Sequence, residues 1–265
     1  MKIRKMLIII SIILFSSMQS CIISINDDSN CMKGTGSIVS EQVTVDPFNA
    51  VVNETVVDVE IVQGDSQSVI IEGHQNMIDE LDLSVSHGEL TVDLRGHCYK
   101  NFKLKVYITV PDLTAVTLKS TGDMKLGSFD NIQSLSVGIK STGDLYCDGT
   151  LTIDQLLELE STSTGKIDLD VTTDEIVTYM SGTGNITLSG SCKSQYIELS
   201  STGSYHAFDL DSEDCEVRNS GVGDVKVYVT DNLDVSISSV GSVYYMGDPV
   251  VKVNDKGVGK LIHVN

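Results

Sequence analysis

Acidic and amide side chains follow regularly spaced glycines in the second half of the chain. Asp123, Asp144, Asn185 and Asp224 each come directly after a glycine. If these glycines stack at one corner of a repeated structure, the oxygens form a column that could bind Ca²⁺ or another ligand. Ca²⁺ takes about six or more oxygens, and Lys166 interrupts the column. Asp and Asn are also good turn residues, and a turn role is the simpler interpretation.

Paired carboxylates suggest a second kind of chemistry, acid–base attack on a polysaccharide. Asp168 with Asp170, and Asp209 with Asp211, would each share one face of a strand. However, the chain has 37 acidic residues, so such pairs arise by chance. The five histidines are scattered without metal-ligand spacing. We therefore predict no catalytic residue, no metal site and no cofactor.

The glycines before these acidic residues define an internal repeat. A Ser/Gly-Thr/Val-Gly phrase recurs at intervals of 18 to 22 residues. Its central glycines are Gly122, Gly143, Gly165, Gly184, Gly203, Gly223 and Gly241. A fixed period near 20 is typical of a repeat architecture. A sharp corner favours glycine, either for a positive φ or for close backbone approach.

Apolar and polar residues alternate on both sides of each glycine, as in Val116 and Leu118 before Gly122 and Met124 and Leu126 after it. Alternation with period two predicts strands with one buried face. The sequence thus predicts an all-β chain, a right-handed parallel β-helix (β-solenoid) of about seven to eight rungs over residues 113–265. A β-prism or a sandwich is the alternative. The threonines before the glycines are expected to hydrogen-bond the corner backbone.

The chain begins with an export signal. Lys2, Arg4 and Lys5 precede a largely apolar run from Met6 to Phe15, which is too short to span a bilayer and is typical of a signal peptide. Small residues then lead up to Cys21, an arrangement that resembles a lipoprotein box. We predict a signal peptide at 1–20, a lipidated Cys21 and a polar tether over 21–33, giving a lipid-anchored outer-membrane protein on the cell surface or the periplasmic face.

Residues 34–112 also contain strands, but without the repeat. We predict a hairpin joining Val57–Ile61 to Val69–Glu72, and another joining Leu81–Val85 to Leu90–Leu94 through His87-Gly88. A helical turn is expected between Asn76 and Leu81. This part would cover the first rung and form one continuous domain (34–265) with the repeats, while residues 250–265 cap the far end.

The net charge narrows the possible ligands, and the cysteine count limits the possible disulfides. The net charge is −19, or −22 without the first 20 residues, so nucleic-acid binding is excluded. Apart from Cys21 five cysteines remain, an odd number, so at least one thiol is free or pairs between chains. Cys147 shares an inward column with leucines. Cys31 and Cys98 could link the tether to the N-terminal part. Cys192 and Cys215 are one rung apart but offset by three positions relative to their glycines, which disfavours direct stacking of the two thiols.

Several phrases resemble a known family. These are Leu104–Asp123, Pro47–Val52, Val62–Asp65 and Ser181–Asn185. In this order and spacing they are similar to the head GIN domain family of putative auto-transporter adhesins, over about residues 34 to 264. The resemblance implies a β-helix-like fold in cell-envelope lipoproteins and carries the adhesin label.

Three function classes follow. The first is a non-enzymatic adhesin or binding module that offers an acidic β-helical surface to a glycan or protein ligand. The second is a structural envelope component that forms a homo-oligomer through exposed solenoid ends. A carbohydrate-active enzyme is the least favoured class, because basic and aromatic residues are few; Tyr244 and Tyr245 are the aromatic patch that the sequence suggests.

Overall fold

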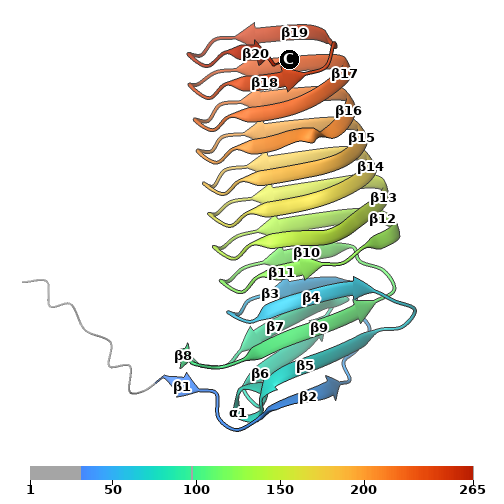
Figure 1. Ribbon diagram of the computed structural model, residues 1–265, viewed down its shortest axis with the longest axis vertical. Coiled ribbons are helices and arrows are strands. Elements are labelled where there is room, and N and C mark those ends of the chain that lie inside the picture. Colours follow the sequence, from blue (N-terminus) through green and yellow to red (C-terminus); the bar gives the residue numbers. More distant parts are fainter. Residues whose placement is uncertain (1–30, 97, 265) are drawn as a thin grey trace, which may run out of the picture.

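The computed structural model describes residues 31–96 and 98–264, which form 20 strands and one short helix. The predicted signal peptide and Cys21 lie outside the described residues. The all-β class and the β-solenoid are confirmed, and the solenoid has about seven turns (Figure 1). No helix in the described part of the chain is long and apolar enough to cross a membrane.

The solenoid is built from strands that stack in parallel on their equivalents one turn later. Each of the long strands β13 to β16 runs from one glycine corner, around the far edge, to the next corner (Figure 1). In sequence order the strands are β10 (Ala115–Leu118), β11 (Met124–Leu126), β12 (Phe129–Ile139), β13 (Leu145–Ser161), β14 (Ile167–Met180), β15 (Ile186–Leu199), β16 (Tyr205–Asn219), β17 (Val225–Ile237), β18 (Val243–Met246), β19 (Val250–Asp255) and β20 (Leu261–His263).

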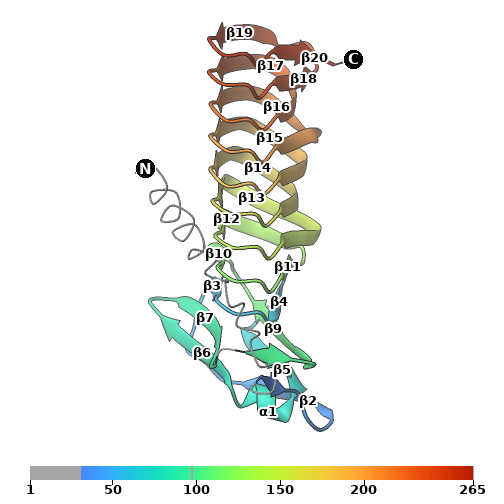
Figure 2. The same ribbon diagram turned by 90° about the vertical axis from the view of Figure 1, so that its left-hand side faces the viewer.

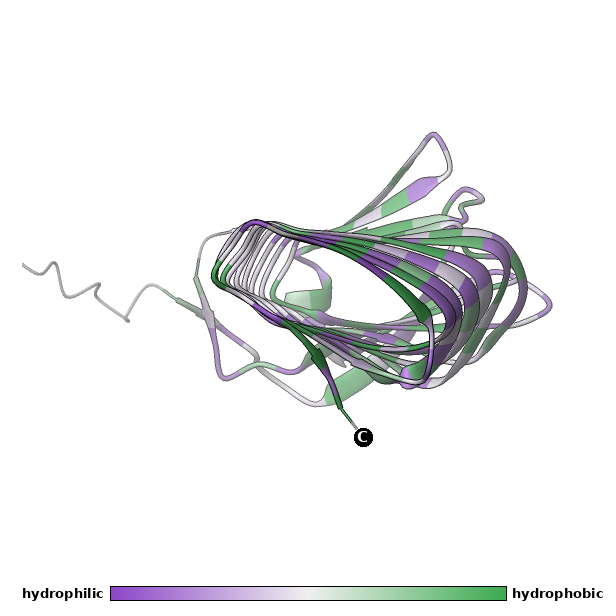
Figure 3. Cartoon of the chain, turned by 90° about the horizontal axis from the view of Figure 1, so that it is seen from above, coloured by the Kyte–Doolittle hydropathy of each residue, from purple (hydrophilic) through white to green (hydrophobic). Residues whose placement is uncertain are grey.

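Inward-facing side chains fill the solenoid in straight columns. One column has an exposed fraction of 0% in seven successive turns, at Met124, Leu145, Ile167, Ile186, Tyr205, Val225 and Val243. Burial of such apolar surface is the main stabilising contribution to the fold. Seen along the axis, the turns superpose on a flattened outline with a narrow corner at one end (Figure 3).

The narrow corner explains the repeated glycines. None of the seven has a positive φ. Instead, a Cβ at any of them would lie well under 3.0 Å from the carbonyl oxygen of the corner residue one turn earlier. At Gly184, for example, that oxygen belongs to Gly165. Close approach of stacked backbones, rather than a left-handed conformation, therefore excludes a side chain.

The parallel stack extends into the N-terminal part, beyond the boundary at 113 that the repeats suggest. β3 (Ala50–Asn53) and β4 (Asp58–Gln63) form one turn, which pairs in parallel with β10 and β11. β7 (Glu89–Leu94) and β9 (Leu104–Val110) pair in parallel with the other side of that turn. β7 and β9 therefore lie below β3 and β4 in the stack, although they come later in the sequence.

This arrangement contradicts the first predicted hairpin. β5 (Ser68–His74) does not pair with β4, because β9 lies between them: it pairs in parallel with β4 and antiparallel with β5. The second hairpin is confirmed, since β6 (Leu81–Ser86) pairs antiparallel with β7 through a turn in which His87 and Gly88 have φ of 54° and 79°. The helical turn is present as α1 (Gln75–Ile78).

Antiparallel strands cover the lower end of the stack. β2 (Ile38–Val43) pairs with β5, and the β6–β7 hairpin extends to the side of the solenoid (Figure 2). A disulfide joins Cys31 to Cys98, and β1 (Met32–Lys33) pairs beside it with β8 (Tyr99–Lys100). The end of the predicted tether is therefore fixed to the base of the solenoid.

The three other cysteines of the described residues carry free thiols: Cys192 and Cys215 are buried and Cys147 is half-buried. Cys192 and Cys215 are therefore not paired with each other, in agreement with their offset along the turns. Burial raises the pKa of Cys192 to about 12. A buried, protonated thiol of this kind behaves as a small hydrophobic side chain.

The upper end is less covered. β19 and β20 form the last turn, on β17 and β18, and no described strand pairs with their outer edge. The exposed fractions of Val250 and Val253 are 74% and 50%. Lys252 forms an ion pair with Asp234, which agrees with a charged end, but the valines make this end only partly polar.

Candidate functional site

The predicted corner column of acidic and amide residues exists, and it hydrogen-bonds the backbone. The side-chain oxygen in one turn accepts a bond from the backbone N–H of the equivalent residue in the next. The bonds run from Asp123 N to Asp58 Oδ1 (3.0 Å), Asp144 N to Asp123 Oδ1 (2.9 Å), Lys166 N to Asp144 Oδ1 (2.9 Å), Ser204 N to Asn185 Oδ1 (2.9 Å), Asp224 N to Ser204 Oγ (3.3 Å) and Ser242 N to Asp224 Oδ1 (2.8 Å).

The column therefore has a structural task in every turn that supplies an acceptor. Ser204 and Ser242 continue it, whereas Lys166 offers no oxygen. The first member of the column is Asp58. Sequence reasoning missed it because Val57, and not a glycine, precedes it. No three His, Cys, Asp or Glu side chains in the described ranges are placed to hold a metal ion. A ligand role for the column stays a prediction.

The corner hydroxyls are arranged differently from the prediction. The side chains that donate to the previous turn are two residues earlier than the predicted threonines: Thr162 donates to the carbonyl of Ile139 and Ser200 to that of Met180. The threonines, such as Thr142 and Thr183, point into solvent. In later turns the position of these threonines is taken by the exposed Val222 and Val240.

The predicted carboxylate pairs lie on the strands after the corner. Asp168 and Asp170 are on β14, and Asp170 accepts a hydrogen bond from Ser189 Oγ at 2.8 Å. Asp209 and Asp211 lie on β16. None of these four carboxylates lines a surface depression of about 610 Å³ that lies elsewhere on the solenoid.

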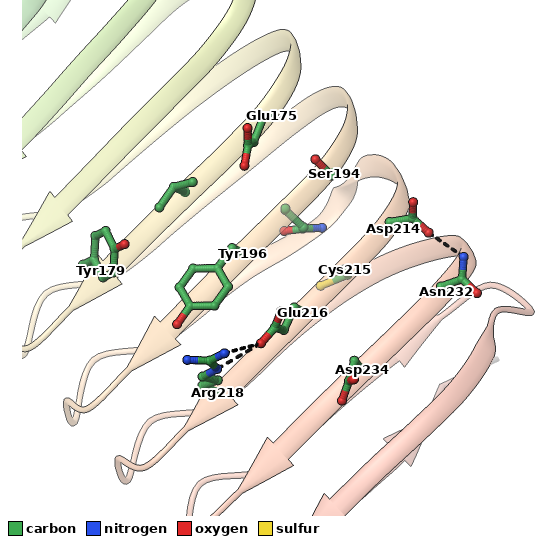
Figure 4. Close-up of a pocket in the computed structure, with 12 residues that line it drawn as sticks. Glu175, Tyr179, Ser194, Tyr196, Asp214, Cys215, Glu216, Arg218, Asn232 and Asp234 are labelled. Carbon is green, nitrogen blue, oxygen red and sulfur yellow. Dashed lines mark hydrogen bonds and ion pairs between the residues drawn. The ribbon is translucent and has the colours of Figure 1, made fainter.

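That depression lies on the strands before the corner, and two tyrosines are among the residues that line it. Tyr179 on β14 and Tyr196 on β15 are diagonal neighbours, with ring centroids 6.1 Å apart and planes at 61°. Register explains the contact: Tyr179 is opposite Glu198, and Tyr196 is opposite Val177 and Glu216. We call the outer surface around this pair, from β14 to β17, the tyrosine face (Figure 4).

Neighbouring charges hold Tyr196 in place. Its hydroxyl donates to Glu198 Oε2 at 2.8 Å, and the Arg218 guanidinium lies 5.2 Å from its ring centroid. Glu216 accepts from Arg218 Nε at 2.9 Å. Burial, and then the hydrogen bond to Glu198, raises the pKa of the Tyr196 hydroxyl, which therefore stays protonated at neutral pH. Tyr179 remains open, with an exposed fraction of 43%.

The depression has a volume of about 610 Å³, within the range of ligand sites. Its lining includes Glu175, Asp214, Glu216, Asp234 and a single basic residue, Arg218. The site is thus an open, acidic concavity that contains two tyrosines. Below it, Gln195 is almost fully buried.

Gln195 anchors the floor to the core. Its Oε1 accepts from the buried Tyr205 hydroxyl at 3.0 Å, and its Nε2 donates to Ser212 Oγ at 2.8 Å. Ser212 in turn donates to the Tyr228 carbonyl. Each of these buried polar groups has a partner, so the network rigidifies the strand that carries Tyr196.

Sequence reasoning missed the tyrosine face and named Tyr244 and Tyr245 instead. Tyr245 stacks on His263 near the upper end, with centroids 4.6 Å apart. A usable signal was present: Tyr179, Tyr196 and Arg218 lie five, seven and five residues before their corner glycines. Odd offsets on this strand point outward, so aligning the turns on the glycines brings the three together.

Comparison with known proteins identifies the family. The model described as "Putative auto-transporter adhesin, head GIN domain" matches residues 47–249. The chain belongs to the head GIN domain family. No curated protein matches it.

Solved structures share the head GIN fold. A putative adhesin from Parabacteroides distasonis has a TM-score of 0.79 at 24% identity, covering 89% of this chain and 100% of its own. A putative adhesin from Bacteroides fragilis has a TM-score of 0.67 at 23% identity, with 88% and 100% covered. A third, from P. distasonis, is called a putative lipid binding protein; its TM-score is 0.73 at 17% identity, with 88% and 99% covered. At these identities the likeness shows the fold alone.

Proposed function

We propose that this head GIN domain is a non-enzymatic binding module of the cell envelope and that the tyrosine face is its contact surface. The observation that carries the proposal is the exposed Tyr179 beside Tyr196, whose ring is held by Glu198 and Arg218. Rigid aromatic side chains supply contact area at low entropic cost. The names of the structural relatives support an adhesin-like role.

The fold would present this face away from the anchor. If Cys21 is lipidated, as the sequence predicts, the disulfide at Cys31 holds the chain against the base of the solenoid. The tyrosine face lies on β14 to β17, toward the opposite end (Figure 1). A rigid stack of β-strands would thus act as a spacer between an outer-membrane anchor and the ligand.

Ligand binding and cellular location need separate tests. Cells that export the full-length protein are treated with protease, with Cys21→Ala as the control for anchoring. Loss of the protein from intact cells supports surface display, whereas protection until the outer membrane is broken indicates the periplasm and contradicts the adhesin role. Cells that carry Tyr179→Ala or Tyr196→Ala should adhere less to their target surface; unchanged adhesion would exclude the tyrosine face.

Self-assembly is a second candidate, favoured by the exposed valines at the upper end. Val250 and Val253 lie on β19, whose outer edge pairs with no described strand. An uncovered strand edge with apolar residues is a template for association. Analytical ultracentrifugation of the full-length protein should then detect a dimer that Val253→Lys dissociates. A monomer at all concentrations would exclude this function.

A further inference from the structure

We propose that the ligand of the tyrosine face is an uncharged linear polysaccharide that lies along the solenoid axis. This inference rests on the proposed function, because it names the ligand class of the same surface.

The spacing comes from the strand register. Outward-facing residues before the corner form two straight columns, one position per turn. The first contains Glu158, Val177, Tyr196, Glu216 and Asp234, and the second contains Glu160, Tyr179, Glu198, Arg218 and Ser236. Hydrogen-bonded strands are about 4.8 Å apart, so the face repeats at that interval and spans roughly 14 Å from β14 to β17. A polymer with regularly repeated polar groups matches such a surface.

The side chains of the face suit sugar rings. The exposed ring of Tyr179 offers an apolar surface for the C–H groups of a sugar. Carboxylate side chains outside ion pairs, such as those of Glu175 and Asp214, offer two acceptor oxygens each. A ligand rich in hydroxyl donors satisfies both requirements.

Charge excludes an anionic polymer. Four carboxylates line the depression. Glu216 pairs with the single basic lining residue, Arg218, which is packed over Tyr196, and Asp234 pairs with Lys252. Glu175 and Asp214 have no ion pair among the described residues. Phosphate, sulfate or uronate groups would therefore meet uncompensated negative charge, on a protein whose net charge is −19.

A basic peptide is the main competitor, and two features disfavour it. The cation position over Tyr196 is occupied by Arg218, at 5.2 Å from the ring centroid. The strands of the face are paired on both sides, from β13 through β17, so a peptide finds no free edge on which to add a strand.

The inference is tested by titration calorimetry on the full-length protein in detergent. The probes are neutral cello-, malto- and chito-oligosaccharides of two to six residues, polygalacturonate and oligolysine. For at least one neutral series, affinity should rise with chain length up to the length of the face and then level off. Polygalacturonate should not bind, and oligolysine should bind more weakly than the preferred oligosaccharide.

Variants locate the site. Tyr179→Ala and Tyr196→Ala should each weaken binding about tenfold, the effect of losing one aromatic contact of the larger kind. Tyr146→Ala is the matched control, because Tyr146 is 39% exposed but lies on β13 after the corner, on another face. Equal losses for all three variants would overturn the assignment.

The outcomes separate this inference from the proposed function. If no neutral oligosaccharide binds but adhesion of cells still depends on Tyr179 and Tyr196, the polysaccharide is wrong and the binding module stands. If oligolysine or polygalacturonate binds most tightly, the ligand class is likewise wrong. If the tyrosine variants change neither adhesion nor binding, both proposals fail.

Discussion

Replacing one corner glycine with alanine should destabilise the whole solenoid, and Gly184 is the clearest position. The new Cβ would overlap the Gly165 carbonyl oxygen and lie only 3.0 Å from its carbonyl carbon. Both atoms belong to the backbone, so no side-chain rotation relieves the overlap. The two turns must instead move apart by about 1.5 Å to restore an ordinary contact.

The cost follows from the bonds at this corner. Thr183 N and Gly184 N both donate to the Ser163 carbonyl at 2.8 Å, and a separation of this size lengthens both bonds. Losing two net hydrogen bonds costs about 2 kcal/mol, and residual overpacking adds about 1–3 kcal/mol. Reduced entropy of the unfolded chain offsets about 0.4–1 kcal/mol. We expect a net loss of about 2–4 kcal/mol in the free energy of unfolding.

Gly138→Ala is the matched control. Gly138 also lies in the stack, on β12, but a Cβ there would be 3.7 Å from the Thr117 side chain, an ordinary contact. This variant should be as stable as the parent or slightly more stable. Urea unfolding followed by far-UV circular dichroism measures both, with m-values compared because repeat proteins can unfold in parts. Equal midpoints for the two variants would refute the close-approach explanation.

Three other perturbations test the base, the floor and an ion pair. Cys98→Ala opens the 67-residue loop closed with Cys31, and the chain-entropy relation predicts a loss of up to about 4 kcal/mol, measured as a shift in urea midpoint that reducing agent abolishes. Tyr205→Phe leaves the buried Gln195 oxygen without its donor and should cost about 1–3 kcal/mol by the same assay, while a neutral result would mean that water replaces the hydroxyl. Hydrogen bonding, chiefly from Lys105, lowers the pKa of Glu60. The Glu60 carboxylate therefore stabilises the fold fully at pH values above the ordinary glutamate pKa of about 4.3. This stabilisation is lost as the pH falls through the lowered pKa of Glu60. The stability difference between the parent and Glu60→Gln should therefore shrink on acidification, and a difference independent of pH would contradict the ion pair.

The repeat was predictable from sequence because each turn meets the same local constraint. Gly165 and Gly184 both lie against a carbonyl of the previous turn, so the residue type recurs at every corner. The alternation around them reports which side chains face the core. Corner position, inward columns and the all-β solenoid could thus be read directly.

The N-terminal turn was not predicted, because it lacks the corner glycine that identifies the later turns. Val57 stands where later turns carry glycine, although Ala50 pairs with Ala115 and Asp58 bonds Asp123 across 65 residues. The failed hairpin has a related cause. β9 follows β4 by more than 40 residues and then lies between β4 and β5, and backbone pairing carries no residue code that would reveal such an insertion.

The tyrosine face shows the same limit at the candidate site. Tyr179, Tyr196 and Arg218 are separated by 17 and 22 residues in the chain, and only the register of stacked turns makes them neighbours. Their outward direction could be counted from the corner glycines, but the sequence does not show how the two rings lie against each other.

The sequence by itself thus determined the repeat, its buried columns and the family to which the chain belongs, since these depend on residue type at a fixed local spacing. Only the tertiary structure decided which turns stack on which, where the N-terminal strands insert and which side chains form the face. Those outcomes depend on hydrogen bonds between distant backbones, and such bonds form equally well in many registers until the packed core selects one.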